Sequence, residues 1–112
     1  MPAVSQETGG NGDWVAARDL SVKPVPPALG PQLERLYPEE ARRRGLSGSA
    51  ALRVRIEADG RVRKTTRLHE SFPGFAEACR RALLGSRWTP PRDRTGRAVA
   101  TEVRYTCEFV IE

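Results

Sequence analysis

The residues of this sequence most suited to chemistry are one histidine, two cysteines and a short glycine-rich run. His69 directly adjoins Glu70 and Ser71, so these three side chains do not form a plausible catalytic triad. No cysteine lies near His69 at the spacing of a zinc site, and we expect His69 to have a surface or capping role. The glycine-rich residues 9–12 lack the lysine and following helix of a phosphate-binding loop. We therefore expect no catalytic residue, no metal and no cofactor, and we predict that the protein is not an enzyme.

The composition indicates one small globular domain with a basic surface. The chain has 112 residues, of which 38% are apolar and 29% are charged, and its net charge is +5. All nineteen basic residues except Lys23 and Lys64 are arginines. This excess charge indicates either attraction to anionic partners, in a cell envelope or on nucleic acid, or an ordinary solvated basic surface.

The N-terminal part of the chain has the composition of a linker. Residues 1–13 are rich in glycine and small polar residues, and four prolines follow within residues 22–31. We expect residues 1–21 to be flexible linker and residues 22–112 to be the folded domain, with the proline-rich part extended. No stretch is long and apolar enough to span a membrane, and the first residues lack the pattern of a signal peptide. A secreted domain of this kind would be a piece of a longer protein.

Two segments have the pattern of helices. Residues 38–45 begin with a proline and two glutamates and end with three arginines and a glycine, the order that suits the two ends of a helix. Residues 73–86 form the stronger helix, because their apolar side chains recur at helical spacing. That stripe consists of Phe75, Cys79, Ala82 and Leu83.

A β-hairpin follows the first helix. Residues 50–58 alternate between apolar and charged side chains, as in a half-buried strand. A loop of residues 58–60 pairs Ile56 with Val62, whereas a two-residue loop would turn Val62 to the polar face. The return strand, residues 61–69, is weakly patterned, and a bulge near Arg63 would fit it.

The last strand, residues 99–111, is the longest and most apolar. It begins at the same end as the second strand, so in an antiparallel sheet it must pair with the first. We predict an α+β fold, with a three-stranded antiparallel sheet in the order second, first, third and two helices packed on one face. The last strand is then an edge without proline, lysine or glycine between residues 99 and 107. Either the N-terminal segment or a second copy covers it, or it binds a peptide strand.

The order of these features resembles the TonB C-terminal domain family over residues 26–112. The features are Tyr37 and Pro38, then Gly45 and Gly48, then Asp59, Gly60, Arg61 and Val62, then Gly74 and Phe75, then Trp88, Thr89, Pro90 and Pro91, then Gly96, and last the final strand. One departure is that Arg35 and Leu36 stand where the family often has glutamine and proline, in a segment implicated in receptor contact.

The resemblance implies a periplasmic domain, a monomer or weak dimer, whose missing anchor links it to an inner-membrane motor complex. Such a domain captures an extended segment of an outer-membrane receptor by strand addition and transmits force to it. The capturing residues would be Val99, Ala100, Thr101, Glu102, Val103, Arg104, Tyr105, Thr106 and Cys107. The second partner-binding segment would be Arg35, Leu36, Tyr37 and Pro38.

An alternative function is a TonB-like scaffold or adaptor in another envelope machine, for motility or transport, that binds partners through its basic face. The open face of the sheet would carry Arg53, Arg55, Glu57, Glu102 and Arg104. RNA-binding sheets instead expose aromatic side chains there, and in this sequence Tyr105 and Phe109 point toward the core. We therefore expect no nucleic-acid partner.

The two cysteines lie on elements that should pack on each other. Cys79 belongs to the helix stripe, and Cys107 lies on the core face of the last strand. Cysteines in an oxidising compartment commonly pair, whereas a buried free cysteine is an ordinary small hydrophobic residue. We expect a Cys79–Cys107 disulfide that fixes the last strand to its supporting helix.

Overall fold

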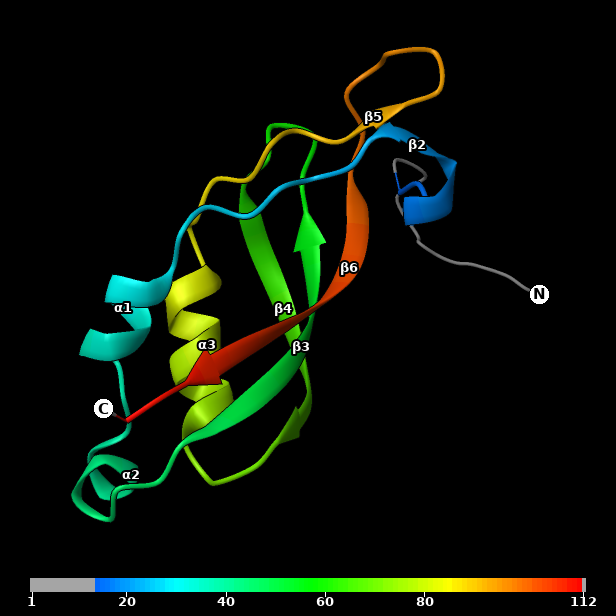
Figure 1. Ribbon diagram of the computed structural model, residues 1–112. Coiled ribbons are helices and arrows are strands. Elements are labelled where there is room, and N and C mark those ends of the chain that lie inside the picture. The colour runs from blue at the N-terminus through cyan, green and yellow to red at the C-terminus, as the bar shows by residue number, and fades with distance from the viewer. Residues whose placement is uncertain (1–13, 112) are drawn as a thin grey trace.

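The core of the structure is a three-stranded antiparallel sheet with helices on one face (Figure 1). The structure is a computed structural model that describes residues 14–111. The strand order is β4 (Val62–Glu70), β3 (Gly48–Ile56) and β6 (Thr101–Phe109). The predicted fold class and the order second, first, third are therefore confirmed. The linker predicted for residues 1–13 lies outside the described residues.

The hairpin between β3 and β4 has the predicted register. Ile56 pairs with Val62, and residues 58–60 form the loop. Gly60 has a φ of 90°, and a Cβ at this position would lie 2.1 Å from the carbonyl oxygen of Trp88. The loop therefore requires glycine for both its conformation and its space.

β4 contains two bulges. Arg63 and Leu68 each lack a partner residue on β3, because the residues on either side of them pair with consecutive residues of β3. The bulge predicted near Arg63 is present, and the one at Leu68 was not predicted. Leu68 is partly exposed, since the bulge takes it out of the regular alternation of the strand.

The predicted helices are both present, and a third lies before them. α3 (Phe75–Leu83) packs on β3 and β4 with its apolar stripe buried. α1 (Gly30–Arg35) packs against α3 and β6, and Figure 1 shows it beside α3 on the same side of the sheet. α2 (Glu39–Arg43) lies at the end of the sheet, with Ala41 fully buried. The two helices on the face are therefore α3 and α1.

The structure corrects the expected boundary between linker and domain at residue 22. A short 3-10 helix, η1 (Ala17–Asp19), leads into β2 (Leu20–Val22), which pairs with β5 (Arg92–Asp93). Leu20 is buried, so the described fold begins before residue 22. Its apolar side chain stabilises a segment that composition alone assigned to the linker.

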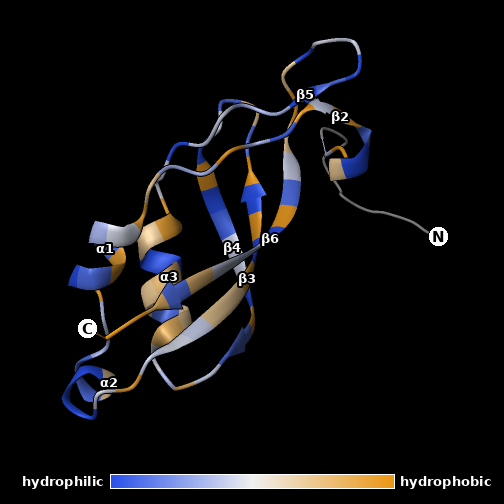
Figure 2. Ribbon diagram, in the orientation of Figure 1, coloured by the Kyte–Doolittle hydropathy of each residue, from blue (hydrophilic) through white to orange (hydrophobic). Residues whose placement is uncertain are grey.

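Aromatic side chains fill the core between the sheet and the helices. Phe75 of α3 and Phe109 of β6 stack with their ring centroids 4.6 Å apart. Tyr37 meets both rings edge-on, at 5.8 Å and 5.6 Å. Figure 2 shows hydrophobic and hydrophilic bands following one another along β6, the pattern of a strand with one buried face, whereas β4 is mostly hydrophilic. A disulfide joins Cys79 to Cys107 in the same layer.

Candidate peptide-binding edge

The two edges of the sheet differ in how well they could accept another strand. β4 is interrupted by its two bulges and carries Arg63, Lys64 and Arg67, features that protect natural edges from pairing. β6 pairs with β3 without any shift of register, from Phe109 opposite Gly48 to Thr101 opposite Ile56. The described part of the chain therefore has one protected edge and one regular edge.

The outward backbone groups of β6 belong to its even-numbered residues. Val15 N donates to Ala100 O from outside the sheet, at 2.9 Å. Because successive residues of a strand direct their backbone groups to opposite sides, the outward groups beyond Ala100 are those of four residues. They are Glu102, Arg104, Thr106 and Glu108. Their side chains lie on the open face, since the odd-numbered residues of β6 face the core.

The N-terminal segment covers the beginning of this edge. Trp14 forms a parallel bridge with Ala100, and the Thr101 hydroxyl donates to Val15 O at 2.5 Å. This is the coverage that the sequence left as one of its alternatives. Its bridge and hydrogen bonds reach Ala100 and Thr101, which lie near the beginning of the predicted capturing residues. Among the described residues, no β-pairing reaches the outer side of β6 beyond Ala100.

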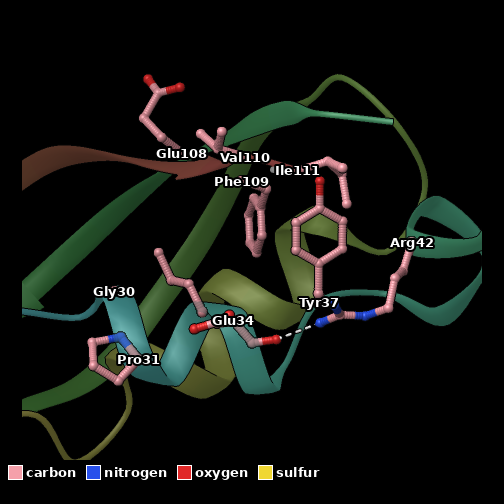
Figure 3. A pocket seen from close by; sticks show the side chains of 10 residues that line it. Gly30, Pro31, Glu34, Tyr37, Arg42, Glu108, Phe109, Val110 and Ile111 are labelled. Atoms are coloured by element: carbon pink, nitrogen blue, oxygen red, sulfur yellow. Dashed lines mark hydrogen bonds between the residues drawn. The ribbon is translucent and has the colours of Figure 1, made fainter. Parts of the chain in front are cut away.

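A groove lies beside the other end of β6, between that strand and α1 (Figure 3). Its volume is about 690 Å³. Ten residues line it: Gly30, Pro31, Leu33, Glu34, Tyr37, Arg42, Glu108, Phe109, Val110 and Ile111. Val110 is 66% exposed, so an apolar side chain stands at the mouth of the groove. A strand added to β6 would end next to this space.

Tyr37 forms one wall of the groove rather than an exposed contact. Its ring is buried against Phe109, and its hydroxyl donates to the carbonyl oxygen of Leu46. The Arg42 guanidinium lies over the outer side of the ring, 5.1 Å from its centroid, and donates to Glu34 O at 2.7 Å. Tyr37 therefore positions the groove and has little surface of its own to offer a partner.

The other residues predicted in the Tyr-Pro segment are placed differently. Arg35 is exposed at the end of α1, and Leu36 is partly buried against the core. Pro38 lies beside Gly74, where an added Cβ would be 3.2 Å from the proline ring. The structure thus brings the segment to the end of β6 through the contact between Tyr37 and Phe109.

Several groove residues were not anticipated from the sequence. Pro31 and Glu34 line the groove beside the end of β6 because α1 packs against that strand. Arg42 comes from α2 and is held there by its hydrogen bond to Glu34 O. Val110 and Ile111 could have been found, since they continue the last strand past residue 107. Trp14 could also have been found, because a tryptophan is unusual in a linker composition.

Trp88 and His69 lie outside the groove and the outer edge of β6. Trp88 is buried, donates from Nε1 to Ser86 Oγ at 3.1 Å and meets Tyr105 edge-on, so it is a core residue. His69 is exposed on β4. Residues 14–111 contain no cluster of side chains able to hold a metal ion. None of the helices described here is long and apolar enough to cross a membrane.

Comparison with known proteins identifies the family. The model of the Gram-negative bacterial TonB protein C-terminal matches residues 34–111. The chain belongs to this TonB C-terminal family. Its fold is also similar to the solution NMR structure of the Pseudomonas aeruginosa TonB C-terminal domain, with 27% identity and a TM-score of 0.58. That match covers 88% of this chain and 94% of the other. A search of curated proteins found no match.

Membership of the TonB family agrees with the lack of a catalytic constellation in the sequence. Domains of this family are energy-transducing and binding domains of the Gram-negative envelope rather than enzymes. The family match spans α2, the whole three-stranded sheet and α3. β2, η1 and most of α1 precede it, so the N-terminal segment that covers Ala100 lies outside the matched region.

Proposed function

We propose that this TonB C-terminal domain acts in the periplasm and captures an extended segment of an outer-membrane receptor or another envelope protein. The segment adds as a strand to the outer side of β6. The observation that carries the proposal is the contrast between the two edges of the sheet. β4 is interrupted by bulges, whereas β6 is regular and, among residues 14–111, pairs with no strand on its outer side beyond Ala100. The groove beside α1 would receive side chains at the end of the added strand.

The connections of β6 suit a strand that bears load. In its parent protein, anchored in the inner membrane, the domain would receive force through its N-terminal side. Val15 and Thr101 connect that side directly to the beginning of β6. The Cys79–Cys107 disulfide ties the far half of β6 to α3. Force entering at the N-terminus would therefore reach the bound segment through β6.

The proposal is tested by NMR titration with peptides from the N-termini of candidate receptors. We expect amide shifts at residues 102–108 and slower hydrogen exchange at the outward amides. Thr106→Pro removes one outward N–H without removing a hydrogen bond to β3, and it should abolish binding. Thr106→Ala is the matched control and should bind normally.

The result that contradicts the proposal is also specific. If no candidate peptide shifts residues 102–108, or if Thr106→Pro binds as well as Thr106→Ala, strand addition to β6 is wrong. Binding that survives Thr106→Pro but is lost with salt or with Arg53→Glu would favour a scaffold role for the basic face.

A further inference from the structure

Two arginines face each other across β3 and β6 on the open side of the sheet. Arg53 is directly opposite Arg104, and both are exposed. Arg53 and Arg104 form a non-hydrogen-bonded pair of the β3–β6 ladder, because the backbone N–H and C=O of Arg104 point away from β3. Side chains are closest at such positions, with Cα atoms about 4.5 Å apart. Like charges directly opposite each other destabilise a sheet.

Neither arginine has an acidic partner within the described chain. The ion pairs of residues 14–111 include neither Arg53 nor Arg104. Their neighbour Arg55 differs, because two acidic residues lie close to it. It is opposite Glu102 on β6, and its Nε lies 3.3 Å from Glu57 Oε2. That second contact is an ion pair without hydrogen-bonding geometry. Arg53 and Arg104 are thus two directly opposed positive charges without an ion-pair partner among residues 14–111.

Arg104 is also one of the four residues of β6 whose outward backbone groups pair with no strand in the described part of the chain. A strand added to β6 would place one residue beside Arg104, about 4.8 Å away, with its side chain on the same open face. On the basis of the strand addition proposed above, we propose that the partner segment carries a carboxylate side chain, Asp or Glu, opposite Arg104. That carboxylate would offset the repulsion between the two arginines.

The surrounding residues restrict the register of the partner. Trp14 and Val15 cover the edge at Ala100, so pairing begins at Glu102. Among the free positions, Glu102 and Glu108 would repel an acidic side chain and Thr106 is neutral. An acidic residue of the added strand should therefore increase the binding affinity most when it lies opposite Arg104. The partner class is an extended segment with apolar residues facing the core side and a central acidic residue facing the open side.

The test uses capped peptides whose sequence is the same in both directions, so strand direction does not affect the result. The probe Val-Thr-Val-Glu-Val-Thr-Val is compared with versions carrying Gln or Lys at the centre. The affinity of each for the disulfide-bonded protein is measured by titration calorimetry, and the site is located by amide shifts. We expect the Glu probe to bind about fivefold or more tighter than the Lys probe, with Gln between them.

Charge reversal supplies the decisive comparison. Arg104→Glu should reverse the order, so that the Lys probe binds most tightly. Lys64→Glu makes the same change of charge on the same face, but β4 lies about 10 Å from β6, and the order should persist. Arg104→Gln should raise the melting temperature, because it removes the repulsion from Arg53 without adding an acid.

Three results would overturn the inference. If all three probes shift residues 102–108 with equal affinity, strand addition stands and the requirement for a carboxylate is wrong. If Lys64→Glu changes the order of the three probe affinities as much as Arg104→Glu does, the preference depends on the overall charge of the protein and not on Arg104. If no probe shifts β6, the inference and the proposed strand addition fail together.

Discussion

Cys79 of α3 and Cys107 of β6 are joined by a disulfide whose Cα atoms are 5.8 Å apart, and both residues are buried. The bond closes a loop across a sequence separation of 28 residues. Restricting the unfolded chain in this way should stabilise the fold by about 3–4 kcal/mol. We predict that reduction lowers the free energy of unfolding by that amount, measured by urea denaturation with and without reductant.

The control for this prediction is the Cys79→Ala/Cys107→Ala double variant, whose stability should not respond to reductant. We also expect reduction to speed hydrogen exchange in β6 more than in β4, because β6 loses its covalent link to α3. Equal stability of the oxidised and reduced protein would contradict a stabilising role for the bond.

The hydroxyl of Thr101 holds the N-terminal segment against β6. Thr101 is fully buried, and its hydroxyl donates to Val15 O. Thr101→Val keeps the shape and removes the donor, so it should cost about 0.5–1.5 kcal/mol. Exchange of the Val15 amide should become faster, as measured by NMR.

Thr106→Val is the matched control, because Thr106 is exposed and lies five residues further along β6 than Thr101. It should leave the Val15 amide unchanged. Equal exchange at Val15 in all three proteins would show that the hydroxyl does not retain the segment.

Much of this fold follows from local patterns. The alternation of Leu52, Val54 and Ile56 with arginines predicts β3 and its buried face, and the stripe from Phe75 to Leu83 predicts α3. The hairpin register could be predicted because only one loop length places Val62 on the apolar face. The strand order then follows from the length of α3 and the direction of the last strand.

The elements that could not be predicted depend on long-range contacts. α1 has glycine and proline in its first turn, so its local pattern resembles an extended segment, and it forms where Leu33 is buried against the core. The contact of Val15 with Ala100 joins residues that are far apart in sequence. The groove needs α1, Tyr37 and the end of β6 together, so no single motif could indicate it.

Comparing Gly60 with Gly45 separates the two costs of replacing a glycine: the steric clash of an added Cβ and the strain of a positive φ. Both have positive φ, 90° and 65°. A Cβ at Gly60 would lie 2.1 Å from Trp88 O, whereas nothing lies within 4 Å of a Cβ at Gly45. We predict that Gly45→Ala costs about 1–2 kcal/mol, from conformation alone. Gly60→Ala should cost about 3 kcal/mol or more, since overpacking adds to the strain.

Thermal or urea denaturation of the two variants measures this difference. Gly60→Ala should also perturb the amide shifts of Trp88 and its neighbours, because Trp88 N donates to Gly60 O at 2.7 Å. Equal losses of stability in the two variants would mean that the loop moves away from Trp88 at little cost.

Asp93 organises the turn after β5. Its Oδ1 accepts hydrogen bonds from the Thr95 hydroxyl and from the backbone N–H groups of Thr95 and Arg97. The hydrogen bond from the Thr95 side chain is the largest cause that holds the pKa of Asp93 below its ordinary value of 3.8, and the backbone donors and the Arg97 charge act in the same direction. The ionised carboxylate is therefore favoured in the folded state.

This pKa shift predicts how stability depends on pH. A lowered folded pKa gives stabilisation that is complete above the unfolded pKa and is lost as pH falls through the folded value. Asp93→Ala should thus melt at a lower temperature than the natural protein at pH 7, and the difference should shrink below about pH 4. Thr95→Val removes the main cause and raises the folded pKa of Asp93, so the loss of stability on acidification should be smaller and should end at higher pH than in the natural protein. Melting temperatures measured from pH 7 to acid test this, and a difference that stays constant with pH would show that Asp93 acts through packing rather than charge.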